Sequence, residues 1–457
     1  MLHLSEVTRT TTPVHYTWAS SNKNFVKLAV FDQPTNGLFY FKILFNADQL
    51  PTSLKPYLFL FTYFLPRLGA GGRSNEETER CLKLWTGGLT SRVVLSQNGF
   101  AINNFKTGVL LESYCLPENI ENLFSLIKDF LNTPNFDDKQ NIETLLDSLL
   151  ADLTNDIIEN GHNMASIRSS AHISDFHAYK EVLLGLSQVR FIINIHENIE
   201  QIIESMKSIV KYVFTKKNVK AAVHSDLLQE TSTNIPNILE LLDSSMLNLP
   251  QVSPREAGST CDQKFVFTSK PCYLPLEGAT SFNALSFRGF PLNDSRFPSL
   301  QVLSKIINRK FLHRELREMS GAYGTGCTAQ NGALSFYSYR DPNIERTFST
   351  FEKSFEWLSC MEIDTKMLNE AKLSILQSLD APVSSSHKGM DLFLHDDTYE
   401  QKQMRRNLLF DVSASDIKNV ADEIICSGLL KEAGKASICP PEAQTLEFLK
   451  NWDSFSF

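Results

Sequence analysis

The sequence lacks an apolar run approaching the roughly 20 residues that a helix needs to cross a bilayer. Its eight cysteines are scattered and form no C-x-x-C pair, which suits buried thiols in a reducing compartment better than a disulfide frame or a zinc knot. With 44 Lys and Arg against 52 Asp and Glu, the net charge of −8 lacks the basic excess of a nucleic-acid surface. The N-terminal segment resembles neither an apolar signal peptide nor an Arg-rich transit peptide. We therefore expect no membrane span, no nucleic-acid partner and no targeting peptide within this chain.

Recognisable catalytic motifs are missing as well. The sequence contains no G-x-S-x-G elbow, no P-loop and no dinucleotide-binding fingerprint. Its best metal-like cluster is His172, His177 and Glu181, but His172 and His177 would lie about 500° apart on a helix and share no face. The other candidates are predicted to be solvated polar loop: His387 with Asp391, and His395 with Asp396-Asp397. We predict that this chain binds no metal and no cofactor.

What the sequence does contain is an internal repeat. Hydrophobic content of 42% and 32 Phe are ample for buried cores in a chain of 457 residues. Four short similarities recur in the same order at offsets of about 220 to 245 residues. They pair Pro56 with Pro298 at the start of an apolar helix, Gln97-Asn98-Gly99 with Gln330-Asn331-Gly332, Asn119–Ser125 with Asn343–Ser349, and Asp137-Asp138-Lys139 with Asp364-Thr365-Lys366. This pattern indicates two homologous units.

Each unit groups strands with helices instead of alternating them strictly, which predicts an α+β fold of two homologous αβ-sandwich domains. The stretch from Asn248 to Thr260 has the composition of a linker, so the boundary is placed near Ser253, giving domains 1–252 and 253–457. Within them, the sequence predicts a polar connection over 159–169, one helix over 179–214, strands over 99–110 and 264–266, and helices over 365–379 and 414–425.

The most informative stretch runs from Phe311 to Asn343. Apolar residues at helical spacing from Pro298 predict a helix that ends at Ser320-Gly321. A glycine-rich turn follows, and then residues 333–340 alternate as a strand that ends at Asp341-Pro342-Asn343. Arg317 and Tyr323 therefore flank the turn. One is a permanent cation with a planar donor fork, and the other is a phenol that can donate to an oxyanion.

REMSGAYGTG, followed by SYRDPN, resembles the C-terminal half of the presequence proteases, a subfamily of the pitrilysin/insulinase metallopeptidases. The resemblance covers roughly nine-tenths of the chain. Its other motifs are Gln33–Gly37, Thr86-Gly87-Gly88, Ala165–Arg168, Gln188-Val189-Arg190, Glu370–Ser374, Asp380–Val383 and Lys388–Asp391.

The resemblance implies two duplicated, pitrilysin-like domains that close over a peptide chamber. It implies that Arg317 and Tyr323 reach a zinc site held by the N-terminal half, with Gly321, Ala322 and Gly324 beside the peptide. The H-x-x-E-H string that carries zinc in this family is absent here. Ser320 and Thr325 depart from the family's glycines, and each adds a Cβ where left-handed backbone is expected. The resemblance also implies a mitochondrial matrix location.

Two functional hypotheses follow. In the first, the chain is the half without zinc of a metalloendopeptidase that degrades short unstructured peptides such as mitochondrial targeting peptides, is inactive alone, and docks its zinc-binding partner through an exposed apolar patch. In the second, it is a stand-alone pseudoenzyme, a peptide-binding or scaffold subunit. Because a scaffold needs neither Arg317 nor Tyr323, their presence favours the first hypothesis.

Overall fold

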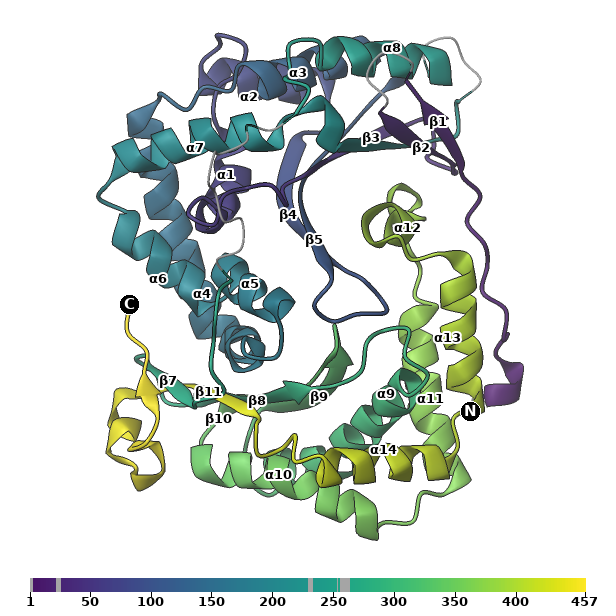
Figure 1. Ribbon diagram of the computed structural model, residues 1–457, viewed down its shortest axis with the longest axis vertical. Helices are drawn as coiled ribbons and strands as arrows, with labels where there is room; N and C mark the ends of the chain where they lie inside the picture. Colours follow the sequence, from purple (N-terminus) through teal and green to yellow (C-terminus); the bar gives the residue numbers. More distant parts are fainter. Residues whose placement is uncertain (1–2, 22–25, 229–232, 253, 255–263) are drawn as a thin grey trace.

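Two six-stranded sheets built on the same plan organise the molecule (Figure 1). In the computed structural model, which describes residues 3–21, 26–228, 233–252, 254 and 264–457, the strand orders are β1-β2-β6-β3-β5-β4 and β12-β7-β11-β8-β10-β9. The first sheet consists of β1 Thr17–Ser20, β2 Lys27–Asp32, β3 Phe39–Asn46, β4 Leu89–Gln97, β5 Phe105–Cys115 and β6 Val219–Ser225. The second consists of β7 Cys272–Pro275, β8 Ser281–Arg288, β9 Gly324–Gln330, β10 Ala333–Asp341, β11 Gly434–Cys439 and β12 Asp453–Ser454.

The predicted duplication is confirmed by this strand order. β2 pairs in parallel with β6, as β7 does with β11, and the central pairs β3–β5 and β8–β10 are antiparallel. One outer pair breaks the symmetry, because β1 runs antiparallel to β2 whereas β12 runs parallel to β7. The predicted linker and the boundary at Ser253 fall mostly outside the described residues, so the domain limits stay a prediction.

Helices from the same part of the chain cover one face of each sheet. The first sheet packs its phenylalanines against α1 Leu58–Phe64, α3 Ile120–Asn132, α7 Ile199–Val213 and α8 Ile235–Ser245. The second packs against α9 Phe297–Ile306, α10 Ile344–Cys360, α11 Thr365–Leu379 and α14 Ala414–Cys426. The remaining helices are α2 Asn75–Trp85, α4 Lys139–Ser170, α5 Asp175–Leu184, α6 Leu186–Ile195, α12 Met390–His395 and α13 Tyr399–Asp411.

The opposite face of each sheet is covered by a helix from the other part of the chain. The distal half of α4 lies on the second sheet, where Ile157 and Met164 pack with Phe282. In return, α12 places Phe393 and Leu394 against the first sheet. Each unit therefore supplies part of the other's core, and the two units are interlocked.

Several predicted elements need correction. The polar segment 159–169 is not a connection but part of α4, which bends at Asn160. Its helical face is hard to see in the sequence because small residues make the contact: a Cβ on Gly161 would lie 2.6 Å from the Phe282 ring. The predicted helix over 179–214 is broken into α5, α6 and α7, with Gly185 between the first two. Residues 264–266 form no strand, and β5 begins at Phe105 after a turn.

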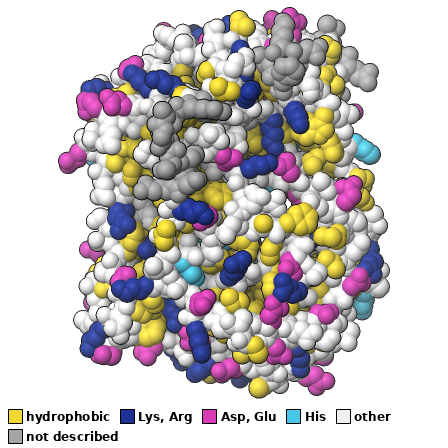
Figure 2. Space-filling view, viewed as in Figure 1, with side chains coloured by type: hydrophobic (Ala, Val, Ile, Leu, Met, Phe, Trp, Pro, Cys, Tyr) yellow, Lys and Arg dark blue, Asp and Glu magenta, His cyan; other side chains and the backbone are white. Residues whose placement is uncertain are grey.

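Other expectations hold in part. The helix over 365–379 is confirmed as α11, and that over 414–425 as α14. Of the cysteines in the described residues, all are free, but Cys360 and Cys426 are exposed instead of buried. Among these residues no helix is both long and apolar enough to cross a membrane. The face seen in Figure 2 intersperses acidic with basic side chains.

Candidate functional site

The Arg–Tyr turn, residues 317–323, follows an unusual helix. After α9 the chain continues as a π-helix, Ile307–Glu318, whose buried residues Ile307, Leu312 and Leu316 are spaced by five and four. This spacing fits the wider turn of a π-helix, a form often found at functional sites. The sequence predicts a helix here but not its π form, because the apolar spacing is compatible with both.

A glycine closes the helix and sets the direction of the chain. Gly321 has φ of +84°, the left-handed conformation that glycine adopts without strain. The amide of Ala322 donates to the Leu316 carbonyl at 2.9 Å, as in a Schellman cap. Ser320 and Thr325 do not have positive φ, so these departures from the family's glycines fit the turn. Ser320 Oγ instead donates to the Glu315 carbonyl at 2.7 Å.

Arg317 and Tyr323 both point away from the core. Arg317 is exposed on the π-helix, and Tyr323 is 68% exposed directly before β9. The Tyr323 ring contacts the Tyr339 ring edge to face, with centroids 5.7 Å apart, and its amide donates to the Arg340 carbonyl at 3.3 Å. Within the described chain neither side chain makes a hydrogen bond or ion pair, so the guanidinium and the phenol are both available to a ligand.

The predicted peptide-contact residues lie at the same place. Ala322 is buried, and Gly321 and Gly324 flank Ala322 and Tyr323 at the surface. The predicted turn is shorter than expected, because Gly324 and Gly326 already belong to β9, the outer strand of the second sheet. Glycine is required at 326, where a Cβ would lie 2.1 Å from the Tyr337 ring.

A basic groove adjoins Arg317. Its volume is about 370 Å³, and Gly324, Thr325 and Met367 form part of its lining. The charged groups in it are Lys305, Arg309, Lys310, His313, Arg317 and Glu370. Glu370 lies 3.7 Å from Arg309 and 3.6 Å from Lys310, which leaves an excess of positive charge. These cations favour an anionic group beside the guanidinium. Sequence reasoning missed the groove, although the spacing of its basic residues along one helix was a usable signal.

The end of β10 is held by a buried carboxylate. Asp341 accepts from Thr347 Oγ1 at 2.6 Å and from the Asn343 amide at 2.8 Å. A register shift between Ser338 and Asp341 accompanies it, and Arg340 takes a φ of +48°. Because the Arg340 carbonyl binds the Tyr323 amide, this network supports the position of Tyr323.

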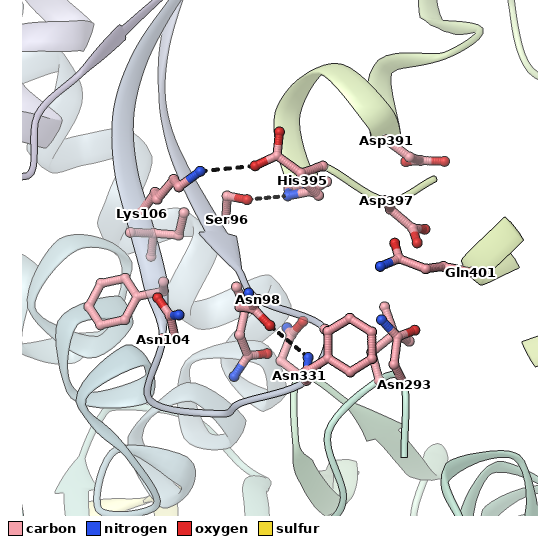
Figure 3. Close-up of a pocket in the computed structure, with 17 residues that line it drawn as sticks. Ser96, Asn98, Asn104, Lys106, Asn293, Asn331, Asp391, His395, Asp397 and Gln401 are labelled. Atoms are coloured by element: carbon pink, nitrogen blue, oxygen red, sulfur yellow. Dashed lines mark hydrogen bonds and ion pairs between the residues drawn. The ribbon is translucent and has the colours of Figure 1, made fainter. Parts of the chain in front are cut away.

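The histidine clusters do not form metal sites in the described residues. His177 and Glu181 are buried in α5, where His177 Nδ1 lies 2.8 Å from Ser174 Oγ, and His172 Nδ1 lies 3.0 Å from the Ser169 carbonyl. Burial lowers the pKa of His177 to about 3. Around α12, His395 Nδ1 is 3.1 Å from Ser96 Oγ and Asp397 pairs with Arg405 at 2.6 Å (Figure 3). No group of three or more potential ligands with metal-binding geometry occurs in the part of the chain described.

Glu181 makes stability depend on pH. The carboxyl is fully buried, accepts from the amide and hydroxyl of Ser187, and lies 3.7 Å from Arg168. Burial raises its pKa from 4.5 to about 7. Between these values the folded state binds more protons than the unfolded state, so stability falls as pH rises, by about 3 kcal/mol in total for this group. Glu181→Gln should therefore gain about 3 kcal/mol relative to the wild type between pH 5 and pH 8.

Urea unfolding of both proteins at the two pH values measures this difference directly. Because the comparison is between proteins at each pH, other titrating groups cancel. Glu356→Gln, an exposed change on α10, is the control and should show no pH-dependent difference. A constant difference between Glu181→Gln and the wild type would contradict the assignment.

Comparison with known proteins places this geometry in a family. The chain matches the model of the peptidase-associated domain of M16 peptidases, subfamily C, over residues 1–195 and the "PreP C-terminal domain" model over residues 280–437. It is 30% identical over 444 residues to the mitochondrial presequence protease of Xenopus laevis and 31% identical over 440 residues to that of Danio rerio. Both alignments cover 92% of this chain and 43% of the relative, so the chain spans less than half the length of these proteins.

Solved structures agree at the level of fold. A protease from Helicobacter pylori has a TM-score of 0.66 at 14% identity, with 94% of this chain and 100% of that chain covered. A peptidase M16 inactive domain from Pseudomonas fluorescens has a TM-score of 0.66 at 12% identity, with coverage of 93% and 98%. The chain thus has the fold of an M16 peptidase half, and it belongs to the presequence-protease family of pitrilysin-type M16 metallopeptidases, corresponding to the C-terminal half of its members.

Proposed function

We propose that this chain is the half without zinc of a peptide hydrolase, and that it presents Arg317 and Tyr323 to an active site held by a zinc-binding half. The observation that carries the proposal is the Arg–Tyr turn, where an exposed guanidinium and an exposed phenol without partners in the described residues flank a glycine-capped helix end. Two such groups have no structural task in this unit. They are placed to contact something outside it.

The chemistry of the two side chains fits peptide hydrolysis. A phenol that points at the carbonyl oxygen of the scissile bond can donate a hydrogen bond to the negative charge that develops there. A guanidinium offers a fixed fork that can hold a backbone carbonyl or a carboxylate of the peptide. The described residues do not fit a catalytic zinc site, so the metal and its activated water belong to the partner half in this proposal.

The proposal extends to substrate and location. Short unstructured peptides, including cleaved mitochondrial targeting peptides, are the proposed substrates, and the mitochondrial matrix is the proposed compartment. The curated relatives named above are mitochondrial presequence proteases, which supports both points. Met319 and Tyr323, exposed by 61% and 68%, mark the proposed docking side for the zinc-binding half.

Reconstitution tests the proposal. The chain alone is expected to bind no stoichiometric zinc and to leave a fluorogenic peptide intact. Mixed with the zinc-binding half of a presequence protease, it should restore cleavage that neither half shows alone. Elemental analysis and the cleavage rate are the two measurements.

Turnover by the chain alone would refute the division of labour. A stable complex without turnover would favour the second hypothesis, a peptide-binding scaffold.

A further inference from the structure

The first sheet carries a groove that neither α12 nor the Arg–Tyr turn uses. On the face where α12 covers Phe31, Leu110 and Ala222, the rest of the sheet is open and forms a hollow of about 900 Å³. Leu44, Val94 and Gly108 lie in its apolar part, and Trp18, 46% exposed, lines it as well. This volume lies within the range of ligand pockets. We call this hollow the lysine groove.

The charges in the lysine groove do not balance. Its cations are Lys27, Lys106, Lys217 and Lys220, and its carboxylates are Asp48 and Asp396. Asp396 is engaged with Lys106 at 2.9 Å and with Lys220 at 3.7 Å. Asp48 accepts from the Thr107 amide at 2.6 Å and from Asn46 Nδ2 at 2.7 Å.

Lys27 and Lys217 are therefore left with unmatched charge. Both are exposed, and neither forms an ion pair with any residue that the structure describes. An incoming carboxylate would gain two cations without displacing an existing partner. Trp18 and the apolar part of the groove add a surface for an apolar side chain next to that charge.

The lysine groove continues into a second hollow lined by amides (Figure 3). The second hollow measures about 320 Å³ and shares Ser96, Lys106 and Asp396 with the first. Its amide side chains come from four separate segments: Asn98 and Asn104, Asn293, Asn331, and Gln401. Amides both donate and accept, which matches the alternating groups of a peptide backbone.

We propose that the lysine groove and the adjoining amide hollow bind an extended peptide by its carboxylates, independently of Arg317 and Tyr323. The carboxylate is either the C-terminus of the peptide or an acidic side chain, and Lys27 and Lys217 are its partners. A small inorganic anion would use the two lysines but not the apolar part, Trp18 or the amides. The site goes beyond the proposed hydrolase role, and binding to it requires no zinc-binding half.

Fluorescence anisotropy with the whole 457-residue chain tests this assignment. The probe is a dye-labelled peptide of about 12 residues with apolar positions, two Glu and a free C-terminus. Replacing both Glu by Gln and amidating the C-terminus should weaken binding by roughly tenfold or more, as expected for about 1.4 kcal/mol of lost ion pairing. Peptides with only one of the two changes identify which carboxylate is bound.

Two double variants of equal charge change separate the site from net charge. Lys27→Glu with Lys217→Glu should weaken binding of the acidic peptide by at least about tenfold. Lys366→Glu with Lys418→Glu, exposed on α11 and α14, should leave it unchanged. Equal binding of the neutral peptide, equal losses in both variants, or displacement by inorganic phosphate as effective as by peptide would each overturn the proposal. None of these outcomes depends on turnover, so they leave the hydrolase proposal untouched.

Discussion

In the reconstituted two-part enzyme, Tyr323→Phe is expected to lower kcat by roughly 100- to 1000-fold while changing KM little. This is the loss seen when one preorganised oxyanion donor is removed from a hydrolase. The substitution removes only the hydroxyl, and the edge-to-face contact with Tyr339 can be kept by phenylalanine. An effect confined to kcat therefore reports a hydrogen bond made in the transition state and not in the ground state.

Steady-state kinetics on a fluorogenic peptide measure the effect. Tyr399→Phe is a matched control, because Tyr399 is also partly exposed but begins α13, outside the Arg–Tyr turn. It should leave both constants unchanged. An unchanged kcat in Tyr323→Phe would show that the phenol is not the donor, and a large rise in KM alone would assign it to substrate binding.

The isolated chain should lose about 3 kcal/mol of stability when Asp341 is replaced by alanine. The side chain is fully buried, and its removal leaves the Thr347 hydroxyl and the Asn343 amide without their acceptor. Each buried donor left unpaired costs about 1–3 kcal/mol. The loss should also loosen the Arg340 carbonyl that holds the Tyr323 amide, so the variant should have a weakened site as well as a weakened fold.

Urea unfolding with the wild-type chain as reference measures this loss. Asp422→Ala, on the exposed side of α14, is the control and should change stability by less than about 0.5 kcal/mol. A loss below about 1 kcal/mol in Asp341→Ala would mean that water or a neighbouring group replaces the carboxylate. The network would then not be what holds the end of β10.

Sequence patterns are most successful where proline, glycine and apolar period agree. The helix from Pro298, the stop at Gly321 and the strand over 333–341 all follow from such local signals. The patterns fail where tertiary contacts replace an apolar stripe. The distal half of α4 contacts the second sheet through Gly161, Ala165 and Ser169, so it looks like polar loop in the sequence.

The candidate site shows the same division. Arg317 and Tyr323 lie close together along the chain and are found through a local motif shared with a family. The lysine groove is invisible in the sequence, because Lys27, Lys106 and Lys217 come from segments far apart along the chain. Only the pairing of β2 with β6 and the fold of the β4–β5 hairpin bring these charges together.

The interlocked helices have a consequence for synthesis on the ribosome. The distal half of α4 is translated before β8, the strand that its apolar residues cover, and the two are separated by roughly 100 residues. At typical elongation rates this gap lasts about 5–20 s. During that interval Ile157 and Met164 have no native surface to cover, so the nascent N-terminal unit should be a client for chaperones until the second sheet emerges.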